Sequence, residues 1–125
     1  NNKKINLFGD VLFTPITIWD LINELEWIID SSISGLFNIG CTESISKYEF
    51  GLRFCKELDL DTSLIKKISI EKLSFSAKRP KNQSLDVSYY EKISKRELPN
   101  IDMTIKSIIT NYQEFKNEWF KHRGN

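Results

Sequence analysis

The sequence predicts an α/β fold, a small mixed domain with a βαβ unit and a C-terminal helix. Short β-branched and aromatic stretches alternate with segments in which apolar residues recur every three or four positions, the period of a helix with one buried face. The longest helical segment lies near the end of the chain. With 125 residues, 40% of them hydrophobic and 28% charged, the composition is typical of one globular domain, which we expect to span residues 1–125.

The first predicted strand lies in residues 11–18, whose sequence VLFTPITI is rich in β-branched and aromatic residues. We expect it to end around Pro15, because proline lacks the N–H that a central strand must donate. A helix is then predicted over residues 17–29, with Thr17 as its N-cap and Asp20 in its first turn. The apolar stripe of this helix comprises Ile18, Leu21, Ile22, Leu25, Ile28 and Ile29.

A βαβ unit is predicted in the middle of the chain. Residues 36–39, bracketed by glycines, are typical of a short buried strand. A helix is predicted within residues 41–58, with Ser44 or Ser46 as its N-cap, and the sequence IKKISI after it favours another strand. Because such units normally place their strands parallel with a right-handed crossover, we expect residues 36–39 to lie beside residues 67–70.

Two further helices are predicted in the C-terminal third. The sequence DVSYYEKIS predicts a short helix over residues 86–94, capped by Asp86 or Ser88. A longer helix is predicted over residues 101–121, with Asp102 near its start, and the terminal KHRGN is expected to fray. The apolar stripe of the long helix comprises Ile105, Ile108, Ile109, Tyr112, Phe115 and Trp119.

Charge and hydropathy exclude several classes of protein. A net charge of +1 creates no global field that would recruit nucleic acid or an anionic membrane surface, so neither is expected as a partner. No apolar run approaches the roughly 18 residues of a transmembrane helix. Cys41 and Cys55 form no CxxC pair, which predicts reduced thiols and a cytoplasmic location. The chain begins without methionine, which predicts that it is part of a longer protein.

No complete catalytic or metal-binding set is expected. His122, the only histidine, has no cysteine or carboxylate partners at metal-ligand spacing, and no glycine-rich phosphate loop is present. Tyr112 and Lys116 lie four residues apart on a predicted helix, the spacing of a pair that could supply a general acid in carbonyl reduction. Because Tyr112 belongs to the apolar stripe, an amphipathic helix with a surface lysine is the favoured interpretation.

The loop SAKRPKNQSLD, residues 76–86, leaves two interpretations open. A run of cations is often only a solvated surface. Alternatively, Pro80 holds Arg79 extended, so that its planar guanidinium can bind phosphate oxygens while Asn82 offers both a donor and an acceptor. Such a loop could bind a phosphorylated small molecule.

The segments DVLFTPITIWDL, GLFNIG, SISKYEFG and RPKNQSLD occur in the order seen in dTDP-4-dehydrorhamnose reductases. The sequence resembles this family, within the extended short-chain dehydrogenase/reductase superfamily, from about residue 10 to the C-terminal helix. The RPxNS-type loop of the family matches at Arg79, Pro80 and Asn82, with glutamine where serine is usual. The DQxGxPT pattern of the family matches at Asp10 and Pro15, with Thr14 a conservative replacement.

The resemblance implies that this chain is the substrate-side, C-terminal portion of a Rossmann-type reductase. Its implied substrate-binding residues are Arg79, Asn82, Thr14 and Pro15, and the implied substrate is a 4-keto nucleotide sugar. The family binds NAD(P)H and carries its catalytic residues in an N-terminal Rossmann domain, which is absent here. We therefore expect no catalytic residue, cofactor site or metal site in this chain.

Other functions remain open from the sequence. The chain could be a non-catalytic interaction or regulatory module that keeps the fold, or part of a nucleotide-sugar epimerase or dehydratase. The expected partners are the nucleotide sugar and the Rossmann domain of the same parent chain. A homodimer is also possible through apolar surface left uncovered on residues 17–29, where Trp19 and Trp27 enlarge the apolar face.

Overall fold

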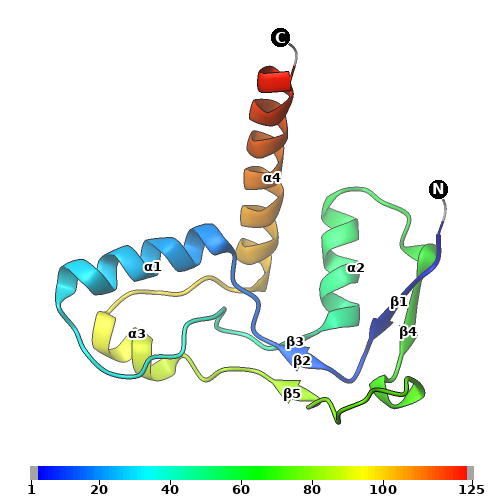
Figure 1. Cartoon of the computed structure of the whole chain (residues 1–125), viewed down its shortest axis with the longest axis horizontal. Helices are drawn as coiled ribbons and strands as arrows, with labels where there is room; N and C mark the ends of the chain where they lie inside the picture. Colours follow the sequence, from blue (N-terminus) through cyan, green and yellow to red (C-terminus); the bar gives the residue numbers. More distant parts are fainter. Residues whose placement is uncertain (1–2, 124–125) are drawn as a thin grey trace.

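The computed structural model describes the backbone of residues 3–123 and the side chains of residues 3–114 (Figure 1). Helices α1 (Ile18–Ser31) and α3 (Ser88–Ser94) lie on one side of the molecule, and α2 (Lys47–Glu57) lies on the other. The C-terminal helix α4 (Ile101–Arg123) rises between them. The α/β class is thus confirmed.

The strands form two small sheets. Strand β1 (Ile5–Phe8) pairs in parallel with β4 (Ile65–Ile68), and α2 packs against both, although β2 (Leu12–Phe13), α1 and β3 (Ile45–Ser46) lie between β1 and α2 in the sequence. In the second sheet, β2 is the central strand, antiparallel to β3 and parallel to β5 (Asn82–Gln83). As predicted, β2 ends before Pro15.

The prediction of a strand at residues 36–39 is wrong, and the partner of β4 is β1 instead. This apolar segment is an irregular connection in which the Leu36 side chain is 91% exposed. Phe37 stacks on Tyr89 of α3, with ring centroids 6.0 Å apart, and Asn38 donates a hydrogen bond to a backbone carbonyl just before α3. Packing against a helix therefore replaces the strand pairing that the local pattern suggested.

The helix starts follow their capping residues closely. Thr17 accepts a hydrogen bond from the Asp20 N–H at the start of α1, as predicted. Ser46, rather than Ser44, caps α2 through a bond from the Glu49 N–H. Each cap satisfies a backbone donor that the first helical turn leaves without a partner.

Helices α3 and α4 occupy their predicted positions. The N-cap position of α3 is Val87, not Asp86 or Ser88, although the Asp86 carboxylate accepts from the Ser88 N–H at 3.0 Å. At the start of α4, Asp102 lies in the first turn as expected. The sequence KHRGN, predicted to fray, lies outside the described side chains.

The cap of α2 yields a first testable prediction. Replacing Ser46 with alanine should lower the free energy of unfolding by about 1 kcal/mol, because the Glu49 N–H loses its acceptor. Urea unfolding followed by circular dichroism measures this change. Exposed Ser44 provides the matched control, since Ser44→Ala should stay within about 0.5 kcal/mol of the parent. Equal losses from both substitutions would contradict the assignment of the cap.

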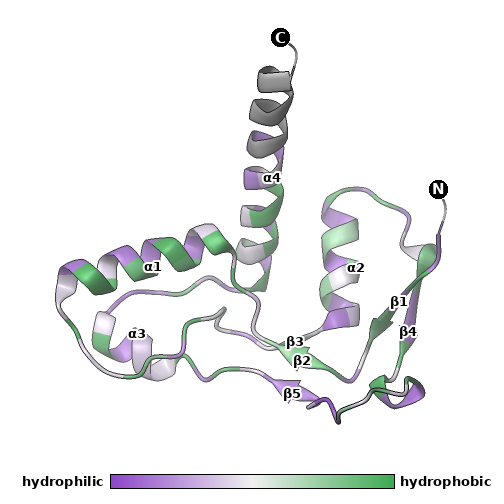
Figure 2. Cartoon of the chain, in the orientation of Figure 1, coloured by the Kyte–Doolittle hydropathy of each residue, from purple (hydrophilic) through white to green (hydrophobic). Residues whose placement is uncertain are grey.

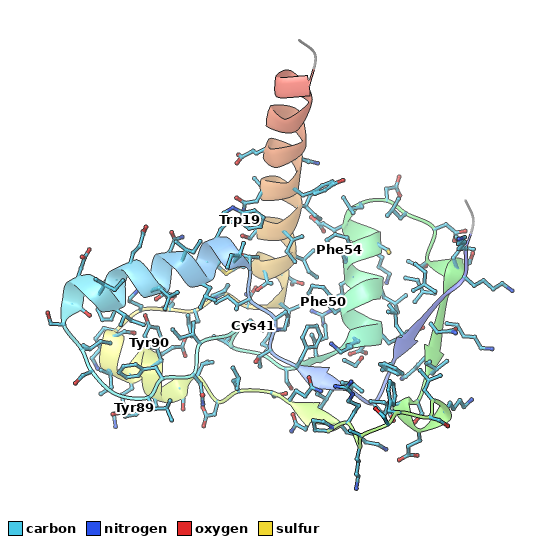
Figure 3. The ribbon with its side chains drawn as sticks, viewed as in Figure 1. Trp19, Cys41, Phe50, Phe54, Tyr89 and Tyr90 are labelled. Atoms are coloured by element: carbon cyan, nitrogen blue, oxygen red, sulfur yellow. The ribbon has the colours of Figure 1, made fainter. Side chains whose placement is uncertain are left out.

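Two apolar clusters form the core. The first consists of buried Cys41, Ile45, Ile101 and Ile105, against which Phe13, Phe50, Phe54 and Ile109 pack. Figure 3 shows Phe50 and Phe54 extending from α2 toward the base of α4. The second consists of Val87, Tyr90 and Leu98, contacted by Trp27, Ile28, Ile33, Phe37 and Ile39. One cluster thus joins α2 to α4, and the other joins α1 to α3.

Helix α1 keeps a large apolar surface uncovered. The apolar residues of this helix are the green bands in Figure 2. Its exposed apolar side chains are Ile18, Trp19, Ile22, Leu25 and Ile29, with Ile29 77% exposed. No helix among the described residues is both long and apolar enough to cross a membrane.

Candidate functional site

The two segments that carry the predicted binding residues lie side by side. Leu12 pairs with Asn82 and Phe13 with Gln83 where β2 and β5 run parallel. The Leu12 N–H also donates to the Lys81 carbonyl at 2.7 Å. This pairing, which we call the β2–β5 junction, brings residues 10–15 and 79–86 together across the long stretch of sequence between them.

Thr14 extends the junction beyond the paired strands. Its Oγ1 accepts a hydrogen bond from the Leu85 N–H at 3.2 Å, linking positions 71 residues apart. Gly40 packs closely against Thr14, since a Cβ at position 40 would lie 3.1 Å from the Thr14 carbonyl oxygen. Thr14 and the adjacent Pro15 are half-buried, so this predicted pair forms the wall of the junction.

Asn82 and Arg79 occupy the exposed side of the same loop. The Asn82 Oδ1 accepts from the Ser84 N–H at 3.0 Å, which shapes the turn after β5. The Arg79 guanidinium lies 5.7 Å from the centre of the Phe75 ring, and it joins no ion pair among the described side chains. Its positive charge is therefore available to an anion.

A pocket of about 890 Å³ opens beside Arg79. Its lining combines apolar and cationic side chains, including Ile70, Leu73, Phe75, Lys78, Arg79 and Lys81. Cavities that hold small molecules are commonly of this size, with apolar walls and a few placed polar groups. The pocket could therefore accept an anionic ligand with an apolar portion.

Asp10 and Lys81 fix the base of the loop, a function that the sequence analysis did not assign. Asp10 accepts hydrogen bonds from the Ser69 hydroxyl at 2.6 Å and the Ile70 N–H at 2.9 Å. The Ser69 bond is the main cause that lowers the pKa of Asp10. Lys81 contacts both Asp10 and Glu71. Because Asp10 lies about 60 positions before Ser69 and Ile70, no local pattern indicated the cluster.

Comparison with known proteins decides the family. The family model described as the RmlD substrate binding domain matches residues 1–114. The chain belongs to this family. The resemblance inferred from the motifs at both sides of the β2–β5 junction is confirmed by this match.

Solved structures share the fold of this RmlD domain. The dTDP-4-dehydrorhamnose reductase of Bacillus anthracis, in complex with NADP, superimposes with a TM-score of 0.79 at 18% identity. This match covers 87% of the present chain and 38% of that chain. The dTDP-4-dehydrorhamnose reductase of Clostridium acetobutylicum gives a TM-score of 0.73 at 23% identity, over 89% of this chain and 39% of the other.

A curated relative adds a sequence match. The probable low-salt glycan biosynthesis reductase Agl14 of Haloferax volcanii is 28% identical over 87 residues. These residues make up 70% of the present chain and 29% of that protein. The RmlD domain described here thus spans well under half the length of each of these relatives.

The remaining candidates from the sequence are not assembled into a site by the described residues. Tyr112 is 60% exposed on α4, while the side chains of Lys116 and His122 lie outside the described part of the RmlD domain. No group of three or more metal-ligating side chains occurs among the described residues. That Tyr112 and Lys116 share one face of an amphipathic helix therefore stays a prediction.

A partly buried ion pair in the RmlD domain was missed by the sequence analysis. Arg96 donates two hydrogen bonds to Glu24, from Nε at 2.7 Å and from Nη2 at 2.8 Å. The Tyr90 hydroxyl donates to the same carboxylate at 2.6 Å. Glu24 lies on α1 between the apolar positions Leu21 and Ile28. An acidic residue within an apolar stripe was the sequence feature that could have indicated a buried partner for its charge. The cluster joins α1 to α3.

This cluster predicts a loss of stability at alkaline pH. Burial, followed by the hydrogen bond to Glu24, raises the pKa of Tyr90 from 10.0 to about 12. Because the folded pKa exceeds the unfolded one, this contribution is complete below pH 10 and disappears as the pH rises through about 12. Urea unfolding across this interval measures the loss. The loss should be smaller in Tyr90→Phe, and an identical pH profile would contradict the prediction.

Proposed function

We propose that this chain is the C-terminal, substrate-binding part of a nucleotide-sugar reductase resembling dTDP-4-dehydrorhamnose reductases. In the complete protein, a nicotinamide cofactor would reduce the ketone of a 4-keto nucleotide sugar. The β2–β5 junction is the observation that carries the proposal, because it joins both motif segments of an RmlD domain, and Arg79 of the second segment lines a pocket. The reductase names of the relatives support the reaction class.

In this proposal the cationic loop binds the diphosphate of the substrate. Arg79 contributes a planar guanidinium whose charge is not neutralised by any described carboxylate. Asn82 uses its Oδ1 within the loop, so its side-chain N–H groups would face the ligand. Thr14 and Pro15 would shape the wall against which the sugar rests.

Gly9 and Gly40 do not offer the phosphate cradle that a dinucleotide cofactor would need. A Cβ at Gly9 would collide with the Lys67 side chain, and one at Gly40 would meet Thr14, so neither glycine leaves a phosphate cradle. We therefore assign NAD(P)H to an N-terminal Rossmann domain of the parent protein. This domain would also cover the uncovered apolar surface of α1, and a cytoplasmic location would suit both its cofactor and the reduced cysteines.

Replacing Arg79 with alanine in the full-length protein tests the site. Affinity for the nucleotide sugar should fall by about 1.5–3 kcal/mol, because a charge-assisted hydrogen bond to phosphate is lost. Isothermal titration calorimetry measures the change. Arg53 on α2 provides the control, since it is exposed and already paired with Asp102, and Arg53→Ala should leave the affinity unchanged. Unchanged affinity in Arg79→Ala would refute the assignment.

A further inference from the structure

Lys81 joins three segments through its ammonium group. Its Nζ lies 2.5 Å from the Glu71 carboxylate and 3.5 Å from that of Asp10. Glu71 belongs to the 3-10 helix η2 (Ile70–Lys72), and Asp10 precedes β2. Asp10 is in turn fixed by hydrogen bonds from Ser69 and Ile70 at the start of η2. The ammonium thus sits between the Asp10 carboxylate, which other hydrogen bonds hold in place, and the exposed Glu71 carboxylate.

The main chain of Lys81 is held as well. Its carbonyl accepts the Leu12 N–H at 2.7 Å, one residue before β5 begins. Its hydrogen bond with Glu71 raises the pKa of Lys81, so the side chain stays charged across the physiological range. Lys81 is therefore fixed at both ends, two residues after Arg79.

The neighbouring cations differ from Lys81 in this respect. Lys78 and Arg79 line the same pocket, yet neither joins an ion pair within the described part of the chain. An incoming anion is attracted to charge that is not already neutralised, and two carboxylates offset the charge of Lys81. Within this short loop, Lys81 is therefore held by carboxylates, whereas Lys78 and Arg79 remain available to bind an anion.

We propose that Lys81 is a positioning residue rather than a phosphate ligand. Its bridge to Asp10 and Glu71 holds residues 76–81 against η2, and this places Arg79 at the pocket. We call this bridge the Lys81 clamp. The clamp itself follows from the contacts of this chain, while its benefit to substrate binding rests on the proposed function.

Amide hydrogen exchange in the full-length protein tests the clamp directly. Replacing Lys81 with methionine keeps the length of the side chain and removes its charge. Exchange of the amides in residues 76–86 should become about three- to fivefold faster, the scale expected from losing exposed ion pairs. Lys81→Arg should restore the parent rate, and Lys78→Met should leave it unchanged. Unchanged exchange in Lys81→Met would overturn the proposal.

Binding of dTDP to the same variants separates positioning from direct contact. Lys81→Met should weaken dTDP binding about three- to fivefold, the same factor as for amide exchange, and Lys81→Arg should retain the parent affinity. Weaker binding without faster exchange would make Lys81 a direct ligand, and faster exchange without weaker binding would remove its positioning role. Either result overturns the proposal. A parent protein that binds no dTDP would contradict the proposed function and the link to substrate, whereas the exchange rates would still decide the clamp.

Discussion

Replacing Glu24 with alanine is expected to lower the free energy of unfolding by about 3 kcal/mol. The carboxylate is nearly buried and is the only acceptor seen for Tyr90 and for the Arg96 guanidinium among the described side chains. Removing one member of a buried pair costs roughly 3–5 kcal/mol, because the other charge remains desolvated. Arg96 is 35% exposed, so water recovers part of this loss and places the expected value at the lower end.

The control for this substitution lies on the same helix. Glu26 is exposed on α1, and Glu26→Ala should change the free energy of unfolding by less than about 0.5 kcal/mol. Hydrogen bonds from Arg96 lower the pKa of Glu24, so its contribution is present above pH 4.5 and is lost as the pH falls through its folded pKa. Urea unfolding of Glu24→Ala should show less acid sensitivity than the parent. Equal stability of the two alanine variants would refute a supporting role for the ion pair.

Replacing Ile101 with alanine is expected to lower the free energy of unfolding by about 2–5 kcal/mol. Ile101 is 2% exposed and packs with Cys41, Ile45 and Ile105, where β3 meets the first turn of α4. The substitution removes apolar contacts and leaves a cavity that the surrounding core fills only in part. Chemical denaturation measures the loss.

Met103 offers a control in the same helical turn. Its side chain is 56% exposed, so Met103→Ala should stay within about 0.5 kcal/mol of the parent. The difference between the two variants isolates burial from helix propensity, because both place alanine in the first turn of α4. Similar small effects at both positions would mean that α4 is not anchored through this cluster.

Local chemistry made the helices predictable. Thr17 and Ser46 each precede an apolar stripe of helical period, and their side chains bond to backbone donors only three residues away. Such contacts depend on adjacent sequence alone. The structure accordingly confirms the starts of α1 and α2.

Strand pairing was less predictable, because it depends on partners distant in the sequence. Residues 36–39 have the composition of a buried strand, yet Phe37 finds its contacts on α3 instead. Strand β1 was overlooked because its short sequence INLF shows no decisive alternation, and its parallel partner β4 lies about 60 residues later. The pattern of residues indicates which segments are apolar, but it does not indicate which of these segments pair with one another.

The candidate site shows the same division. Arg79 and Asn82 were predicted as binding residues from the chemistry of their loop, whereas Thr14 and Pro15 were predicted only from the family resemblance. Nothing in the sequence near Lys81 indicates that Asp10 and Glu71 flank its ammonium group. Motifs were thus sufficient to predict the binding residues, while the contacts that support these residues could be identified only from the structure.

The β2–β5 junction has a thermodynamic consequence for the whole molecule. It joins positions 71 residues apart, so any molecule bound across it is released when the chain unfolds. A ligand at a hundredfold excess over its Kd then adds about 2.7 kcal/mol to the free energy of unfolding. The melting temperature of the protein should therefore report whether a ligand occupies the junction, which allows nucleotide sugars to be ranked by thermal shift without any assay of turnover.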